Sequence, residues 1–242
     1  MVHGWAMQSG IWGGLVDALA CRFRVHLVDL PGHGVNRHIP LSRDIHEVTD
    51  LILSETPPAI WLGWSLGGLI ALAAALRQPG RVKKAILVAA TPCFSKSGGW
   101  DCGVDVASQR AFRERLDVDF DKSVREFWFH CFGDAWVDES LSRLGKSSVV
   151  DKLPSKDVML TGLHLLYDSN LLDALGECEV PTLFVGGTRD RTIKPESFAR
   201  AAALMPAADC RLIRGAGHAP FISHQEKVVD MVLKFYEGDQ TV

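Results

Sequence analysis

The sequence predicts an α/β protein: a mostly parallel sheet with helices on both faces, interrupted by a helical insertion. Short apolar runs alternate with amphipathic helix-like runs near both ends of the chain, and this alternation is typical of a parallel sheet covered by helices. The alternation stops between Thr91 and about Gly176, where helix-like stretches predominate. A chain of 242 residues that is 47% hydrophobic can also bury a core of its own.

The elements of the first half follow in a regular order. A strand is expected over residues 23–30, which read FRVHLVDL and precede the turn PGHG. A helix is expected over residues 44–55, followed by a strand over Ala59–Trp64 with the sequence AIWLGW. The next helix pattern, LGGLIALAAALRQP, ends at a proline, and VKKAILVAA is expected to form a further strand.

The alternation returns in the last third of the chain. The run VPTLFVGG predicts a strand, PESFARAAALM a helix and CRLIRG another strand. A last helix is expected over residues 224–235, with Ser223 as its N-cap and Glu226 three residues later. We therefore expect a core made of residues 1–90 and 177–242, and a helical lid made of residues 91–176 above the C-terminal edge of the sheet.

Composition excludes several classes of protein. The formal net charge is -3 and no basic stripe is interleaved with aromatic residues, which argues against a nucleic-acid partner. No apolar run approaches the roughly 18 residues of a membrane span, and the N-terminus lacks the pattern of a signal peptide. Six cysteines show neither C-x-x-C pairs nor zinc-ligand spacing. We expect a cytoplasmic monomer without a metal.

A serine between glycines is the first candidate for chemistry. Residues 63–67 read Gly-Trp-Ser-Leu-Gly, which matches G-x-S-x-G at the junction of a strand and a helix. Such a sharp turn exposes the hydroxyl of Ser65 and directs the free N–H groups of the helix N-terminus towards it. The alternative is a small residue in a tight turn, but the flanking elements favour a nucleophile.

A base and an acid are expected at later strand ends of the same edge. His218 lies in GAGHAPF after one strand, and Asp190 lies in VGGTRD after another. A histidine would take the proton of Ser65, and a carboxylate would orient that histidine. The order Ser, Asp, His is that of α/β-hydrolases. Alone, Asp190 could be a turn or capping residue and His218 a hydrogen-bonded turn residue.

Other polar residues are weaker candidates for catalysis. His224 is expected at the surface or beside the site, and Asp29 is expected to brace the PGHG turn. His3 is expected to shape the loop that follows it. In that loop the backbone N–H of Trp5, together with the N–H of Leu66, would form an oxyanion hole.

Several segments together resemble one family. HGW, HLVDLPGHG, IWLGWSLGGL, TPCF and GHAPFISH resemble the BioH family, the pimeloyl-[acyl-carrier-protein] methyl ester carboxylesterases of biotin synthesis. The resemblance implies the α/β-hydrolase fold and hydrolysis of the methyl ester on a carrier-bound pimeloyl chain. It implies Ser65 as the nucleophile, His218 as the base and Asp190 as the orienting acid. It requires no metal or organic cofactor.

The resemblance also implies a role for the lid. An acyl carrier protein would dock on basic residues of this segment: Arg110, Arg113, Lys122, Arg125 and Arg143. The alternative is a solvated charged helix face, and Glu126 stands where a second lid arginine is expected. Phe127 and Phe129 could line the acyl channel or belong to the lid core.

The start of the chain departs from the family pattern. Members of the family begin with a hairpin and a strand that leads into the HGW loop, whereas His3 here is the third residue. We expect these strands to be essentially absent and to leave unpaired backbone groups inside the sheet, each costing on the order of 1–3 kcal/mol. Either the natural start lies upstream or the short form is real.

Two alternative functions stay open at this point. One is a general short-chain carboxylesterase or lactonase of the same fold. The other is a ligand-binding relative that has lost turnover and uses the same pocket, as hormone-receptor-like hydrolase relatives do. An intact Ser, Asp and His argues against the second.

Overall fold

A four-stranded parallel sheet forms the centre of the protein. The computed structural model describes residues 1–133 and 154–238. Its strands are adjacent in chain order and pair in parallel throughout. They are β1 (Ala59–Trp64), β2 (Val82–Val88), β3 (Thr182–Gly187) and β4 (Ala208–Ile213). β1 has the bounds that the apolar run AIWLGW predicts.

The register of the sheet aligns the C-terminal ends of the strands. Trp64 pairs with Val88 at the ends of β1 and β2, and Gly187 pairs with Ile213 at the ends of β3 and β4. The residues that follow these ends therefore meet at one edge of the sheet, which is where ligand sites of parallel sheets form.

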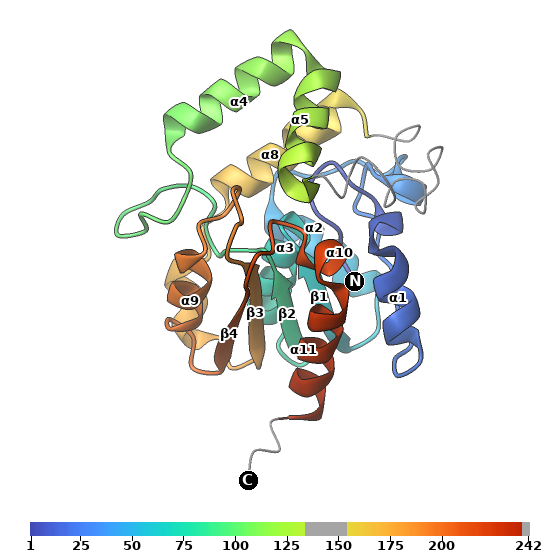
Figure 1. Ribbon diagram of the computed structural model, residues 1–242. Coiled ribbons are helices and arrows are strands. Elements are labelled where there is room, and N and C mark those ends of the chain that lie inside the picture. Colours follow the sequence, from blue (N-terminus) through green and yellow to red (C-terminus); the bar gives the residue numbers. More distant parts are fainter. Residues whose placement is uncertain (134–153, 239–242) are drawn as a thin grey trace.

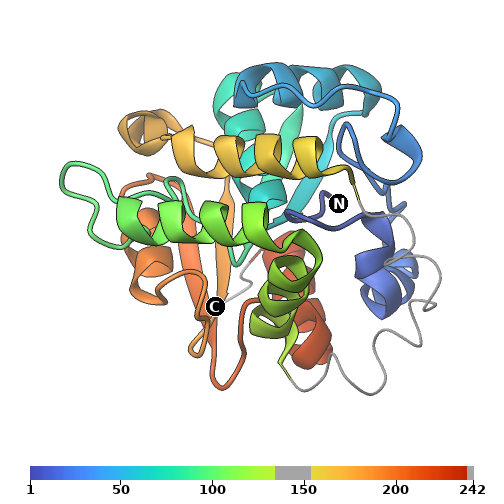
Figure 2. The ribbon, with the colours of Figure 1, turned by 90° about the horizontal axis from the view of Figure 1, so that it is seen from above.

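Helices cover both faces of the sheet. The two faces carry α2 and α3 on one side and α1 and α11 on the other (Figures 1 and 2). α3 is buried along residues 66–75, because it lies between the sheet and α2, which explains why it is apolar all round. The elements of the core outside the sheet are η1 (Ser9–Trp12), α1 (Gly13–Ala20), η2 (Gly34–Asn36), α2 (Ile45–Glu55), α3 (Leu66–Arg77), α9 (Glu196–Ala202), α10 (Pro220–Ser223) and α11 (Gln225–Glu237).

Three long helices lie above the C-terminal edge of the sheet (Figure 1). They are α4 (Val106–Val118), α5 (Phe120–Phe132) and α8 (Lys156–Asp168), and η3 (Leu172–Glu177) leads back to the sheet. Asp105, Asp119 and Ser155 cap the three helices by accepting a hydrogen bond from a backbone N–H of the first turn. The exact lid boundaries, residues 91 and 176, stay a prediction.

The expected strand over residues 23–30 does not form. This segment is extended, but only Val28 makes a β-bridge, and its partner is Val2. Val2 also bridges to Gly63 in β1, so residues 1–3 lie between the two segments as the last part of a parallel strand. Among the described residues no strand pairs with residues 23–27, and a strand needs a partner to form its ladder.

The last helix begins differently from the expectation. Pro220 opens the short helix α10, which includes Ser223, so Ser223 is not the N-cap of α11. His224 occupies that cap position without a side-chain capping bond, and the Ser223 hydroxyl lies 2.9 Å from Nδ1 of His224 instead.

Among the described residues, no helix is both long enough and apolar enough to span a bilayer.

Candidate active site

Ser65 occupies a strained turn between β1 and α3. Its backbone has φ 53° and ψ -115°, a region that side chains other than glycine rarely adopt and that costs on the order of 1–3 kcal/mol. Hydrogen bonds hold the turn: the Ser65 N–H donates to the Val88 carbonyl at 2.9 Å, and the Ser65 carbonyl accepts from Gly68 at 2.9 Å and from Leu69 at 3.1 Å.

Glycines are required on both sides of Ser65. A Cβ atom at Gly63 would overlap the carbonyl oxygen of Gly67, and a Cβ atom at Gly67 would overlap the carbonyl oxygen of Val2. The turn is therefore so tight that its two arms and the N-terminal segment are in backbone contact. This close approach explains the spacing of G-x-S-x-G in physical terms.

Asp190 and His218 are joined at the same edge of the sheet. Nδ1 of His218 lies 2.8 Å from Oδ2 of Asp190, and neither side chain is exposed. The other carboxylate oxygen accepts the backbone N–H groups of Thr192 at 2.8 Å and Ile193 at 3.0 Å. The carboxylate is thus fixed on both oxygens, and it orients the imidazole ring.

Trp64 connects the serine turn to the histidine loop. Its indole N–H donates to the backbone carbonyl of His218 at 2.8 Å, and the two rings lie 5.7 Å apart between centroids. The remaining ring nitrogen of His218, Nε2, is buried and has no hydrogen-bond partner within the described part of the chain. Trp64, which precedes Ser65, therefore holds the backbone of His218, and Nε2 of this histidine forms no hydrogen bond with the described residues.

Trp5 and Leu66 lie on the two segments that adjoin Ser65. Leu66 is the first residue of α3, a position whose backbone N–H has no acceptor within its own helix. Trp5 is buried, and its indole N–H donates to the Met159 carbonyl of α8 at 2.7 Å. α8 makes room for this ring at Gly162, where a Cβ atom would lie 2.8 Å from the ring.

His3 fixes the loop that carries Trp5. Nδ1 of His3 lies 2.8 Å from the carbonyl oxygen of Gly4, and Nε2 accepts the backbone N–H of Leu30 at 3.0 Å. Burial, and secondly the nearby His33 ring, lower the pKa of His3 from 6.5 to about 3, so this imidazole is neutral at neutral pH. The role of His3 is therefore to hold the backbone.

Asp29 braces the turn as its position suggested. Its two oxygens accept the backbone N–H groups of Ser9 at 2.6 Å and Val35 at 3.0 Å. Burial acts to raise the pKa of Asp29, but these hydrogen bonds outweigh it and keep the pKa below its ordinary value. Asp29 therefore remains charged and ties η1 to η2.

The lid contributes aromatic rings next to Trp5. The Phe127 ring of α5 lies 4.9 Å from the Trp5 ring, and the Phe112 ring of α4 lies 5.7 Å from it. Sequence reasoning missed Phe112, because which face of a lid helix packs on the core depends on tertiary contacts. Phe129 does not join this cluster and is 49% exposed. Residues two positions apart in a helix point to nearly opposite sides, so Phe127 and Phe129 lie in different surroundings.

The basic residues of the lid differ in their surroundings. Arg110 is paired with Glu114 at 2.8 Å, although both side chains are well exposed. The Arg113 guanidinium lies over the Tyr167 ring at 5.4 Å, whereas Lys122 and Arg125 are exposed on α5. Arg143 lies outside the described residues. In the part of the chain that the structure describes, no cluster of His, Cys, Asp or Glu is arranged to hold a metal ion.

Comparison with known proteins identifies the family. The model of the alpha/beta hydrolase family matches residues 1–231. A pimeloyl-[acyl-carrier protein] methyl ester esterase of Stenotrophomonas maltophilia is 39% identical over 236 residues, which are 97% of this chain and 91% of that protein. An enzyme of the same name from Xylella fastidiosa is 37% identical over 97% of this chain and 93% of its own length.

Solved structures support the same fold. A hydrolase from Oleispira antarctica superposes with a TM-score of 0.86 at 17% identity, over 98% of this chain and 90% of that one. An esterase from Exiguobacterium antarcticum superposes with a TM-score of 0.85 at 22% identity, over 98% and 91%. By its sequence and its fold, this chain belongs to the alpha/beta hydrolase family and, within it, to the family of pimeloyl-[acyl-carrier protein] methyl ester esterases.

Proposed function

We propose that this protein is a serine carboxylesterase that hydrolyses the methyl ester of pimeloyl-[acyl-carrier protein] in biotin synthesis. The observation that carries the proposal is the contact between His218 and Asp190, next to the strained turn of Ser65. The substrate comes from the relatives, whose names state this activity.

The reaction would proceed in two stages at Ser65. In the first, Oγ of Ser65 attacks the ester carbonyl while Nε2 of His218 takes the hydroxyl proton. The bond between the carbonyl carbon and the methoxy oxygen then breaks, and His218 gives the proton to the departing methanol. In the second, His218 takes a proton from a water molecule, whose oxygen attacks the carbonyl carbon of the acyl-enzyme. The bond from this carbon to Oγ of Ser65 then breaks, His218 returns the proton to Oγ, and the free acid leaves.

The surroundings of Ser65 would stabilise the charges that develop. The backbone N–H groups of Trp5 and Leu66 would hold the negatively charged oxygen, and the N-terminus of α3 adds a favourable dipole. Asp190 would offset the positive charge on His218, and its own bonds to Thr192 and Ile193 keep it in place. The cluster of Trp5, Phe112 and Phe127 offers an apolar wall for the acyl chain.

The lid would receive the carrier protein. We propose that Lys122 and Arg125, which are exposed on α5, contribute to a basic surface for an acidic carrier. Arg110 and Arg113 contribute less, since Arg110 is already paired with Glu114 and Arg113 lies over the Tyr167 ring.

We also propose that the enzyme works as a monomer in the cytoplasm. All six cysteines are free thiols, as a reducing compartment favours.

Two substrates test the activity. Purified protein is assayed on pimeloyl-[acyl-carrier protein] methyl ester and on p-nitrophenyl butyrate, alongside Ser65→Ala. The proposal expects a much larger kcat/KM on the carrier-linked ester and a loss of at least about 10³-fold in Ser65→Ala on both. Equal kcat/KM values would indicate a general esterase, and no turnover of either ester would contradict an enzymatic role.

Charge reversal tests the carrier surface. Lys122→Glu with Arg125→Glu is expected to raise KM for the carrier-linked ester about tenfold and to leave turnover of p-nitrophenyl butyrate unchanged. Lys227→Glu is the matched control, because Lys227 is exposed on α11, away from the lid. An unchanged KM in the double variant would remove α5 from the docking surface.

A further inference from the structure

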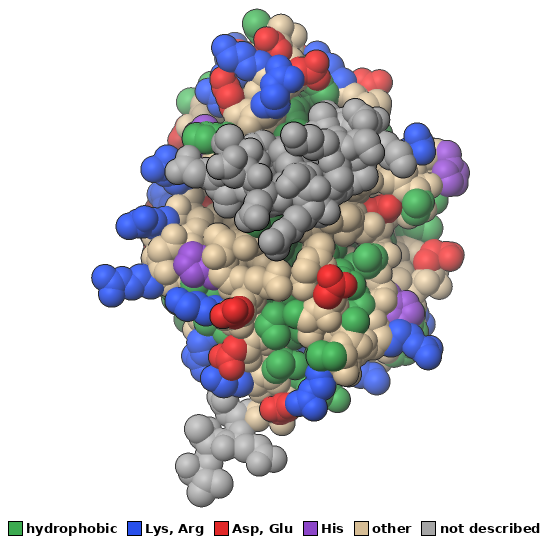
Figure 3. All heavy atoms as spheres, turned by 45° about the vertical axis from the view of Figure 1, so that its right-hand side comes forward, with side chains coloured by type: hydrophobic (Ala, Val, Ile, Leu, Met, Phe, Trp, Pro, Cys, Tyr) green, Lys and Arg blue, Asp and Glu red, His purple; other side chains and the backbone are tan. Residues whose placement is uncertain are grey.

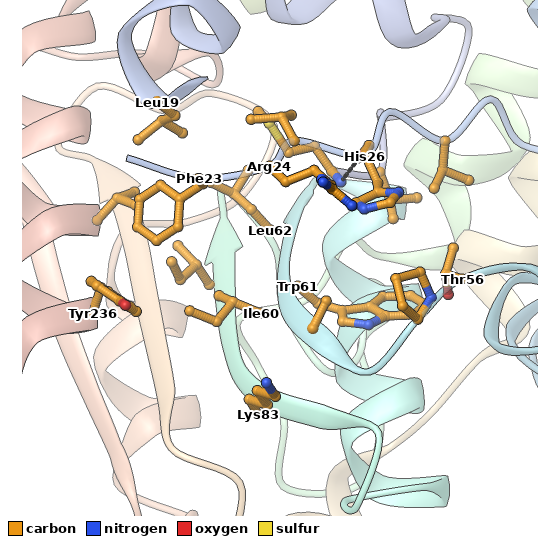
Figure 4. A pocket seen from close by; sticks show the side chains of 18 of the residues that line it. Leu19, Phe23, Arg24, His26, Thr56, Ile60, Trp61, Leu62, Lys83 and Tyr236 are labelled. Atoms are coloured by element: carbon orange, nitrogen blue, oxygen red, sulfur yellow. Dashed lines mark hydrogen bonds between the residues drawn. The ribbon is translucent and has the colours of Figure 1, made fainter. Parts of the chain in front are cut away.

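The described residues form an apolar groove and a polar hollow at different places. The groove opens on the face that carries α1 and α11, where hydrophobic side chains gather (Figure 3). Figure 4 shows Phe23 and Tyr236 at one end of it and Trp61 towards the other. The polar hollow adjoins the candidate site instead, because Asp190 is one of its lining residues.

The polar hollow brings solvent close to the candidate acid. It has a volume of about 280 Å³, and its charged lining residues besides Asp190 are Lys96, Asp105, Arg191 and Lys194. Arg191 and Lys194 are exposed, so solvent reaches the loop that carries Asp190 from this side. The side chain of Asp190 nevertheless has no exposed surface. The exclusion of water from its carboxylate therefore depends on the elements that pack against it.

The last turn of α5 lies against the loop that carries His218. α5 stands above α10, the helix that follows this loop, in both views of the ribbon (Figures 1 and 2). The carbonyl oxygen of Cys131 lies 3.8 Å from the position that a Cβ atom would take at Gly217, which is an ordinary van der Waals contact. The backbone of α5 thus touches the residue that precedes His218.

The side chain of Cys131 contacts the acid. Its thiol is hydrogen-bonded to the side chain of Thr192, and the backbone N–H of Thr192 donates to Oδ1 of Asp190 at 2.8 Å. Burial, and secondly the charge of Asp190, raise the pKa of the Cys131 thiol well above its ordinary value. The thiol is therefore neutral at neutral pH and places no second negative charge beside the carboxylate.

The side chain of Phe132 contacts the other half of the pair. Its ring lies 5.9 Å from the Trp64 ring between centroids, and Trp64 in turn holds the backbone carbonyl of His218. Cys131 and Phe132 are both buried, and neighbouring residues of a helix point about 100° apart. One turn of α5 therefore reaches the acid with one side chain and the support of the base with the next.

We propose that the last turn of α5 is a positioning element of the reaction. Cys131 holds Thr192 and thereby Asp190, and Phe132 holds Trp64 and thereby His218. The inference rests on the proposed function, since it concerns the same acid and base. By covering the pair, the turn also keeps the hydrogen bond between Asp190 and His218 in surroundings of low polarity, where such a bond is stronger.

Removal of the thiol tests the contact with the acid. Cys131→Ala is expected to lower kcat on p-nitrophenyl butyrate about tenfold with less than about a twofold change in KM, because the acid moves while binding is kept. Cys131→Ser keeps a hydrogen-bonding partner for Thr192 and is expected to restore kcat to within about threefold of the wild type. A loss of kcat that Cys131→Ser shares in full would overturn the role of this hydrogen bond.

Cys178→Ala is the matched control for the thiol. Cys178 is also buried, but it follows η3 and precedes β3, at the opposite edge of the sheet from Asp190. This variant loses the same group from the core and should leave kcat unchanged. Equal kcat values in Cys131→Ala and Cys178→Ala would overturn the proposal.

A second pair of variants tests the ring contact. Phe132→Leu is expected to lower kcat about fourfold, because Trp64 loses part of its support. Phe120→Leu is the control, since Phe120 is the first residue of α5 and lies about 18 Å away along the helix. It should leave kcat unchanged. Equal kcat values in these two variants would remove Phe132 from the positioning element.

Proton NMR tests the proposal without any turnover. The proton held between Nδ1 of His218 and Oδ2 of Asp190 is expected to give a low-field signal. We expect this proton to exchange with water at least about tenfold faster in Cys131→Ala than in the wild type or in Cys178→Ala. Equal exchange rates would overturn the proposal. A wild-type protein that hydrolyses neither ester would contradict the proposed function, and the exchange rates would still decide whether α5 supports the pair.

Discussion

The indole N–H of Trp64 donates a 2.8 Å hydrogen bond to the backbone carbonyl of His218. This bond joins the residue that precedes the candidate nucleophile to the candidate base, across 154 positions of the chain. The orientation of the imidazole therefore depends on two contacts: the Asp190 carboxylate at the ring and the Trp64 indole at the backbone.

We expect Trp64→Phe to lower kcat on p-nitrophenyl butyrate about five- to tenfold with little change in KM. The ring packing is kept, but loss of one buried hydrogen bond, worth about 1 kcal/mol, lets the histidine loop move. Trp12→Phe is the matched control. Trp12 also packs on Phe221, and its buried indole N–H has no hydrogen-bond partner among the described residues. Equal kcat values in the two variants would contradict a positioning role for Trp64.

Ser65→Gly is expected to be more stable to unfolding than Ser65→Ala by about 1 kcal/mol. The alanine keeps the Cβ atom that strains the backbone at φ 53°, and glycine does not. Chemical denaturation measures the difference. At Ser197, which lies buried within α9, the same pair should show the opposite order, because glycine weakens a helix. The same order at both positions would mean that the turn is not strained.

Gly162→Ala is expected to lower kcat while changing the melting temperature little. Alanine favours the helix by about 1 kcal/mol, but its Cβ atom would lie 2.8 Å from the Trp5 ring and displace it. The backbone N–H of Trp5 would then leave the position that we propose for it in the oxyanion hole. Gly176→Ala introduces the same methyl group where nothing lies within 4 Å and should leave kcat unchanged. A Gly162→Ala variant with raised stability and full activity would show that kcat does not depend on the exact position of Trp5.

The free energy of unfolding should fall as the pH is lowered from about 6.5 towards 3. His3 has a folded-state pKa of about 3 and an ordinary value of 6.5, so within this window only the unfolded chain binds the proton. Stability is therefore complete above pH 6.5 and falls by up to about 1.4 kcal/mol per pH unit below it. His33, whose pKa is also lowered by burial, acts in the same direction.

Denaturation as a function of pH checks this prediction. His3→Gln keeps an acceptor for the Leu30 N–H but cannot titrate. It should reduce the slope of the free energy of unfolding against pH by up to about 1.4 kcal/mol per pH unit, which corresponds to one proton. His46→Gln, at an exposed position of α2, should leave the slope unchanged. An unaltered slope in His3→Gln would show that His3 is not the group responsible.

The elements that could be predicted from sequence are those whose pattern depends on local chemistry. The strand Ala59–Trp64 and the helix after it are marked by an apolar run that ends at the glycine-flanked Ser65. The expected strand over residues 23–30 does not form, and within the described residues its one β-bridge joins Val28 to Val2. Whether a segment forms a strand depends on a neighbour, which the pattern of the segment itself does not show. An alternating apolar pattern indicates that a segment favours the strand conformation, but it does not indicate whether a neighbouring strand is there to pair with it.

The candidate site also combines residues that could be predicted from the sequence with contacts that could not. Ser65, Asp190 and His218 could be proposed because each follows a strand end, and parallel strands end at one edge. The contacts of Phe112 and of the Trp64 indole could not be proposed, because they join segments whose relative placement is set by packing. Phe127 and Phe129 were each expected to line the acyl channel or to belong to the lid core, and Phe129, at 49% exposed, is not part of the lid core. Helical geometry alone already indicates that the two rings point in different directions.

The bond from the Trp5 indole to the Met159 carbonyl has a consequence for how a substrate enters. This bond connects α8 to the loop whose backbone N–H we propose for the oxyanion hole. An outward movement of α8 would break the bond and would disturb this loop while a substrate is binding. We therefore expect α8 to keep its position relative to the Trp5 loop when a substrate binds.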